Sequence, residues 1–176
     1  MSEVLTLALA GNPNAGKTSI FNALTGSRQH VGNWPGKTVS KYEGSFRRGE
    51  VSGVLVDLPG TYSLSAFSPE EVIARDYLLS REANAVVNVV DATNLERNLY
   101  LTSQMLELEI PLILALNVSD SAKSQGIHID LERLSVLLGG APIVETVGHR
   151  GSGMDELMAA AADLTGLGRV HLELVA

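Results

Sequence analysis

The chain has 176 residues, which suits one domain, and 45% of them are hydrophobic while 19% are charged. Its net charge of −7 argues against a primary role on nucleic acid or on an anionic membrane surface. The absence of cysteine excludes disulfides, iron–sulfur ligation and thiolate metal sites, and no apolar run approaches the roughly 18 residues of a membrane helix.

Short apolar runs alternate with segments of helical period, which predicts a doubly wound α/β domain with a mostly parallel sheet. We expect six strands, at residues 4–10, 38–46, 51–57, 85–91, 111–116 and 141–146. We expect helices at residues 18–25, 69–80, 94–108, 130–138 and 153–164. The pair 38–46 and 51–57 reads as a hairpin that adds one antiparallel edge strand. Residues 26–37 are rich in Gly, Asn and Pro and predict a loop.

The first strand runs directly into GNPNAGKT at residues 11–18, which matches the phosphate-binding pattern G-x-x-x-x-G-K-S/T. Its glycines let backbone N–H groups turn inward around phosphates, Lys17 reaches the β- and γ-phosphates, and the Thr18 hydroxyl ligates Mg²⁺. The following helix directs its positive N-terminus at the same anions. The nucleotide-binding residues expected here are Gly11, Asn12, Asn14, Ala15, Gly16, Lys17, Thr18 and Ser19.

Two later segments predict contacts with Mg²⁺ and the γ-phosphate. Asp57 ends a strand, where its carboxylate can hold Mg²⁺ through water, and Gly60 can offer its N–H to the γ-phosphate. Thr38 is the only threonine in the loop 27–38, and we expect its hydroxyl on Mg²⁺ and its N–H on the γ-phosphate. The alternative for Thr38 is an ordinary residue at the start of a strand. Lys17, Thr38 and Gly60 are therefore the expected catalytic residues.

The base is expected to be guanine. The motif NVSD at residues 117–120 follows an apolar strand, and the Asp120 carboxylate can accept hydrogen bonds from guanine N1–H and the exocyclic amine. Adenine lacks that donor pair, so ATP would leave the carboxylate unpaired. Val118 stands where the common pattern has lysine, which predicts modest affinity. Near guanine O6 we expect the loop at Val147, with the N–H of Gly148 as donor.

With these elements in this order, the chain resembles the translation-factor-related GTPases of the Ras-like P-loop class. More narrowly, it resembles the N-terminal G domain of the bacterial ferrous-iron transporter family, FeoB, over residues 4–165. The segments that carry this resemblance are GNPNAGKTSIFNALTG (11–26), VGNWPGKTV (31–39), VDLPGTYSL (56–64), VVDATNLERNLYLTSQ (89–104) and LALNVSD (114–120).

The resemblance implies a GTPase domain at residues 1–165 on the cytoplasmic face of the bacterial inner membrane. It also implies a small helical domain and then a membrane permease for Fe²⁺ farther along the chain. Residues 166–176 read as the stub of that helical domain. The pattern does not specify an oligomeric state.

The expected mechanism stabilises charge on the transferring phosphoryl group through Lys17, Mg²⁺ and the P-loop amides, while water attacks the γ-phosphate. Thr61 stands where Ras-like enzymes carry a water-positioning glutamine, which predicts slow hydrolysis. No arginine finger is evident, so we expect K⁺ to supply part of the missing charge, held by the side-chain oxygen of Asn14. Asn14 would then be both a catalytic residue and a K⁺ ligand; the alternative is that it only shapes the turn.

We expect the segments 31–38 and 57–75 to change conformation when the γ-phosphate leaves. Trp34, the only tryptophan, lies in the first of them. One rival hypothesis is a soluble GTPase that acts in ribosome assembly or tRNA modification, and the loop VGNWPGKTV and the acidic charge argue against it. A second rival is a nucleotide-binding scaffold without catalysis.

Overall fold

The computed structural model describes residues 4–168, and within them seven strands form one mixed sheet in the order β2-β3-β4-β1-β5-β6-β7. The strands are β1 (Leu5–Gly11), β2 (Gln29–Asn33), β3 (Ser40–Arg48), β4 (Val51–Asp57), β5 (Ala85–Asp91), β6 (Leu112–Asn117) and β7 (Ile143–Glu145). The helices are α1 (Lys17–Thr25), α2 (Pro69–Ser80), α3 (Leu95–Glu107), α4 (Ser119–Ser124), α5 (Leu131–Leu137) and α6 (Met154–Thr165), with short 3₁₀ turns η1 (Ala92–Asn94) and η2 (Gly148–Arg150).

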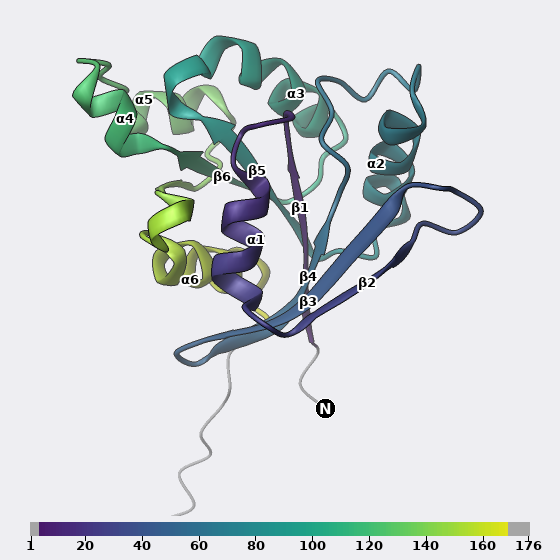
Figure 1. The fold of residues 1–176 in the computed structure, drawn as a ribbon. Helices are drawn as coiled ribbons and strands as arrows, with labels where there is room; N and C mark the ends of the chain where they lie inside the picture. The colour runs from purple at the N-terminus through teal and green to yellow at the C-terminus, as the bar shows by residue number, and fades with distance from the viewer. Residues whose placement is uncertain (1–3, 169–176) are drawn as a thin grey trace, which may run out of the picture.

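The parallel strands lie at the centre of the sheet and are covered on both faces. Leu5, Leu7 and Leu9 of β1 pack on the face that carries α1 and α6, whereas Ala8 and Ala10 pack on the face that carries α2 and α3 (Figure 1). β5 is buried along both faces, which is why its sequence shows no alternation and is apolar up to the terminal Asp91 except at the buried Asn88. The parallel pairings bring the carboxyl ends of β1, β4, β5 and β6 to one edge, where a ligand is expected.

The antiparallel edge has two strands where the sequence predicted one. β3 pairs antiparallel with β4, as expected, but β2 then pairs antiparallel with β3 over residues that we read as a loop. All five residues of β2 are exposed, so no face of this strand carries an apolar pattern. The expectation of six strands was therefore wrong by one, because pairing with β3 rather than burial forms the seventh.

The helices begin where their local sequence predicts. Ser68 caps α2 by accepting a hydrogen bond from the Glu71 backbone N–H (3.1 Å), and the Glu71 side chain accepts one from the Ser68 N–H, which completes a capping box. Pro69 stands in the first turn, where its missing N–H costs nothing. Asp130 caps α5 in the same way through the Arg133 N–H (3.0 Å). α4 is an additional helix of six residues that the sequence did not predict.

The described chain ends next to the sheet. α6 is followed by Gly166 in a left-handed conformation, and the Ser52 N–H donates to the Gly168 carbonyl (3.0 Å). Residues 169–176, most of the expected stub, lie outside the described residues. Between residues 4 and 168, no helix has the length and apolar composition needed to cross a membrane.

Candidate nucleotide site

The loop between β1 and α1 forms a tight turn in which two glycines are required by close approach. Gly16 has a φ of 97°, and a Cβ there would overlap the Asn117 amide. A Cβ on Gly11 would lie 2.5 Å from the Val89 carbonyl oxygen. The Ala15 N–H donates to the Asn12 carbonyl (3.1 Å) and closes the turn in front of α1. The turn therefore has the path that surrounds phosphates with backbone amides at a helix N-terminus.

Lys17 and Asp57 meet beneath this loop. The Lys17 Nζ lies 3.2 Å from Asp57 Oδ1, and the two side chains are 10% and 15% exposed. Burial raises the pKa of the Asp57 carboxyl, and the positive charge and hydrogen bond of Lys17 oppose that rise. The pair places a cation suited to phosphate beside an oxygen ligand suited to Mg²⁺. Thr18, another expected Mg²⁺ ligand, is exposed in the first turn of α1.

The segment after Asp57 runs along the phosphate loop. A Cβ on Gly60 would lie 3.2 Å from the Pro13 Cα, so Gly60 is against the loop as expected. The Thr61 N–H donates to the Gly11 carbonyl (3.2 Å), and Thr61 is only 5% exposed. Because this side chain is buried, it is not presented to solvent in the way that a water-positioning residue needs. The slow hydrolysis expected from Thr61 stays a prediction.

Asn117 joins the phosphate loop to the loop after β7. Its Nδ2 donates to the Ala15 carbonyl (3.0 Å), and its Oδ1 accepts from the Thr146 hydroxyl (3.1 Å) and from the Gly148 N–H (3.0 Å). Asn117 and Thr146 are 2% and 1% exposed. This buried network determines where the phosphate loop lies relative to the expected base-binding loops.

The Gly148 N–H, which we expected near guanine O6, is already bonded to Asn117 in this structure. The Val147 N–H donates to the Ser152 carbonyl (3.1 Å). A Cβ on Gly148 would lie 2.9 Å from Ile20 of α1, so a larger residue would push this loop away from the helix. The contact of Gly148 with guanine stays a prediction, and it requires the N–H to be shared with Asn117.

Asp120 lies in the first turn of α4, after Val118 with a φ of 52°. Its Oδ1 accepts from the Ser121 N–H (2.8 Å), and its Oδ2 lies 3.4 Å from Nη1 of Arg150. Arg150 was not among the expected site residues. No motif marks it, since it lies 30 positions away on a loop whose side-chain directions the sequence does not define.

Thr38 lies away from the phosphate loop. The turn between β2 and β3 is closed by the Trp34 N–H, which donates to the Val39 carbonyl (3.0 Å), and Thr38 is exposed within it. Figure 1 shows this hairpin extending past α2, on the side away from the loop between β1 and α1. The expected contact of Thr38 with Mg²⁺ therefore requires the hairpin to move and stays a prediction.

Trp34 holds the hairpin against α2. It is 6% exposed, and its ring packs edge-on against Tyr77 with centroids 5.4 Å apart. The Nζ of Lys41, which lies on β3, is 4.9 Å from the centre of the Trp34 ring. Burial also raises the pKa of the Tyr77 hydroxyl to about 12, with Glu82 and Glu43 contributing. These contacts attach the end of the hairpin near Trp34 to α2, while β3 joins the hairpin to the sheet by pairing with β4.

Asn14 has a φ of 65° and is exposed on the phosphate loop. It lines a hollow of about 300 Å³ together with Asn12, Gly16, Lys17 and Thr18. The left-handed backbone is a conformation that asparagine tolerates, which fits a role in shaping the turn. Its exposed side chain is also free to turn toward a cation, so the structure leaves both interpretations of Asn14 open.

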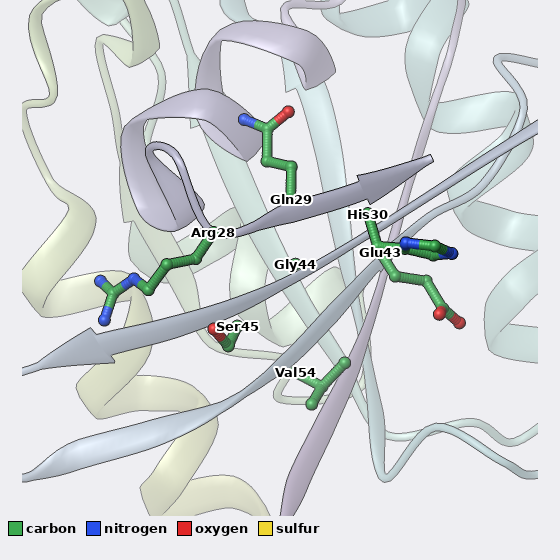
Figure 2. Close-up of a pocket in the computed structure, with 7 residues that line it drawn as sticks. All are labelled: Arg28, Gln29, His30, Glu43, Gly44, Ser45 and Val54. Carbon is green, nitrogen blue, oxygen red and sulfur yellow. The ribbon is translucent and has the colours of Figure 1, made fainter. Parts of the chain in front are cut away.

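A second hollow, of about 320 Å³, lies beyond the C-terminal end of α1 and is lined by residues of β2, β3 and β4. Figure 2 shows that Arg28 and Gln29 point away from each other, while His30 and Glu43 extend together to a third side. The polar groups therefore do not converge on a common point. Because a ligand site needs such convergence, we place the functional site at the phosphate loop.

Comparison with known proteins identifies the family. A family model described as ferrous iron transport protein B matches residues 5–161. The Fe(2+) transporter FeoB of Escherichia coli (strain K12) is 54% identical over 160 residues, which cover 89% of this chain and 21% of that protein. The chain thus spans about a fifth of the length of this relative.

Solved structures give the same result for the fold. A point mutant of S. thermophilus NFeoB bound to GDP is 49% identical, with a TM-score of 0.87 over 92% of this chain and 63% of that one. The cytosolic domain of T. maritima FeoB in apo form is 46% identical, with a TM-score of 0.88 over 97% of this chain and 68% of that one. The predicted Ras-like P-loop GTPase fold is confirmed by these matches.

Proposed function

Because the chain belongs to the ferrous iron transport protein B family, we propose that it binds GTP with Mg²⁺, hydrolyses it slowly and thereby regulates Fe²⁺ uptake through a membrane permease outside this chain. One observation carries the proposal: the part-buried Lys17–Asp57 pair adjoins a phosphate loop whose path requires glycine at two positions. Residues 1–165 would be the GTPase domain, and residues 166–176 would begin a helical domain that leads to the permease.

Lys17 would contact the β- and γ-phosphates, and Mg²⁺ would be held by Thr18, Asp57 and, after closure of the hairpin, Thr38. Mg²⁺ would supply positive charge for the transferring phosphoryl group. The chain's own contribution is to orient the phosphates through the loop amides and to stabilise developing charge through Lys17 and the Gly60 N–H. The absence of an exposed side chain at Thr61 supports a slow reaction.

We propose that K⁺ accelerates the reaction through Asn14, whose exposed position on the phosphate loop supports this role. The test is GTP turnover with Mg²⁺ in KCl and in NaCl at equal ionic strength, for the wild-type chain and for Asn14→Ala. A preference for K⁺ that disappears in Asn14→Ala, with GDP binding retained, is the expected result. Equal rates in the two salts would remove K⁺ from the proposal, and no turnover in either salt would favour a nucleotide-binding scaffold.

We propose that Asp120 selects guanine, with Asn117, Val147 and Gly148 completing the base-binding loops. Asp120→Asn replaces an acceptor by a group that also donates, so it should favour xanthine nucleotides over GTP. Competition of GTP, ATP and XTP against a fluorescent nucleotide measures this preference. Equal affinity of the wild-type chain for ATP and GTP would contradict the assignment. Ser121→Ala, at the neighbouring residue, keeps the carboxylate and serves as the matched control.

The location follows from the same family membership: the domain would act at the cytoplasmic face of the bacterial inner membrane. The rival function in ribosome assembly or tRNA modification is not favoured, because the family match and the relatives named above are iron transporters. Full-length protein reconstituted in vesicles tests the coupling, with Fe²⁺ uptake expected to fall when Lys17 is replaced.

A further inference from the structure

Each oxygen of the carboxylate proposed to select the base already has one partner in the protein. Asp120 Oδ1 accepts from the Ser121 N–H (2.8 Å), and Oδ2 faces Nη1 of Arg150 at 3.4 Å. To bind guanine, the two oxygens of Asp120 must accept hydrogen bonds from N1–H and from the exocyclic amine, one oxygen for each donor. Oδ1 has acceptor capacity left beside the Ser121 N–H, but at Oδ2 the base would meet the Arg150 guanidinium.

Arg150 is held where this competition occurs. It ends η2, the turn whose Gly148 N–H bonds to Asn117 Oδ1. The Arg150 N–H donates to the Val147 carbonyl (3.0 Å), so the backbone of the turn is closed independently of the side chain. Across residues 4–168, Asp120 is the one carboxylate within 4.0 Å of the Arg150 guanidinium. The side chain is thus directed to Asp120 and to no other acidic group of the described chain.

We propose that Arg150 competes with the guanine base for the Asp120 carboxylate and thereby weakens nucleotide binding and speeds nucleotide release. This inference rests on the proposed contact of Asp120 with guanine. The ion pair stabilises the protein before the nucleotide binds and must break as the base enters. When the base leaves, the ion pair between Arg150 and Asp120 forms again. The carboxylate is then blocked, which lowers the probability that the nucleotide rebinds.

The solvent exposure of Arg150 and Asp120 determines how strongly their ion pair can weaken nucleotide binding. The Arg150 and Asp120 side chains are 67% and 29% exposed, so solvent screens the pair and its contribution is modest. Removing the pair should tighten GDP binding by about two- to fivefold, the change that corresponds to an exposed ion pair. In about 1 M salt, where charges are screened beyond about 3 Å, the difference from wild type should become small.

The experiment measures the dissociation constant and the release rate of fluorescently labelled GDP for the 176-residue chain and for Arg150→Gln and Arg150→Lys. Arg150→Gln should bind GDP about two- to fivefold more tightly and release it more slowly. Arg150→Lys keeps the charge and should stay close to wild type. Arg133→Gln, on the exposed surface of α5, is the matched control and should change neither value. Unchanged or weaker binding in Arg150→Gln would overturn the proposal.

A second arm tests whether Arg150 acts through Asp120. In an Asp120→Asn background the ion pair is absent, so adding Arg150→Gln should leave the binding of labelled XDP unchanged. The same gain in that background would also overturn the proposal, because the effect would then not depend on the carboxylate. If Asp120→Asn retains the wild-type preference for GDP, the base contact is wrongly assigned, and both the proposed base contact and this inference fail.

Discussion

The phosphate loop and the β2–β3 hairpin are both expected to contact the same nucleotide, but they are built in opposite ways. The loop is held by buried groups: the Lys17–Asp57 pair and the three hydrogen bonds of Asn117. The hairpin presents five exposed residues in β2 and contacts α2 through Trp34. The first region is suited to hold a ligand in one geometry, and the second is suited to move.

This difference suggests a division of work. A loop that keeps its geometry needs little reorganisation when phosphate binds, which favours stabilisation of developing charge. A segment with few buried contacts has a low free energy of local opening, so a γ-phosphate can change its position. Four predictions test whether this division is correct, in order of decreasing expected effect.

The largest expected effect is the loss of GTP turnover in Lys17→Ala, a substitution in the phosphate loop. The variant loses the cation beside the γ-phosphate, and GTP turnover should fall by about 10²–10³-fold, the usual effect of losing a preorganised electrostatic group. Steady-state release of inorganic phosphate measures it. Lys123→Ala, which removes an exposed lysine paired with Glu145, should retain turnover. Turnover of Lys17→Ala close to wild type would show that this loop is not the catalytic site.

Asn117→Ala should destabilise the whole fold, because it leaves the Ala15 carbonyl, the Thr146 hydroxyl and the Gly148 N–H without their partner. We expect a loss of about 2–4 kcal/mol in the free energy of unfolding. Urea denaturation gives this value. Thr146→Val removes only one of the three bonds and should cost about 1 kcal/mol. Equal, small losses in both variants would mean that the network does not hold the loop.

Trp34→Ala should loosen the hairpin while leaving the phosphate loop intact. Loss of the packing on Tyr77 should speed amide hydrogen exchange in residues 29–34 by about tenfold or more. Exchange in residues 12–16 should stay the same. Val31→Ala, at an exposed position of β2, serves as the control. Faster exchange in both regions would show that hairpin and loop open as one unit.

The smallest expected effect is spectroscopic. Trp34 is the only tryptophan, and its indole is buried between Tyr77 and Lys41 in this structure. If the hairpin closes on GTP and Mg²⁺, the indole leaves this environment. Its fluorescence should then differ between the GDP complex and the complex with a non-hydrolysable GTP analogue. Identical spectra would contradict a change in this segment between the two complexes.

The sequence by itself determined the parallel part of the sheet, five of the six helices to within about a residue at each end, and the identity of the phosphate loop. These features depend on neighbouring residues: β5 and β6 are mainly apolar and show no alternation, Ser68 and Glu71 form a cap three residues apart, and GNPNAGKT joins a strand to a helix. Local patterns of this kind carry their own chemistry, so they can be recognised before any fold is known.

Only the tertiary structure decided the features that join distant positions. Asn117 bonds to Ala15 across 102 residues, Arg150 pairs with Asp120 without any motif, and Trp34 packs against Tyr77 of α2. β2 belongs to the same group, since its exposed residues have no periodicity and its hydrogen bonds come from β3. The physical reason is the same in each case: side-chain direction and strand pairing depend on packing between segments, and no local preference in the sequence encodes that packing.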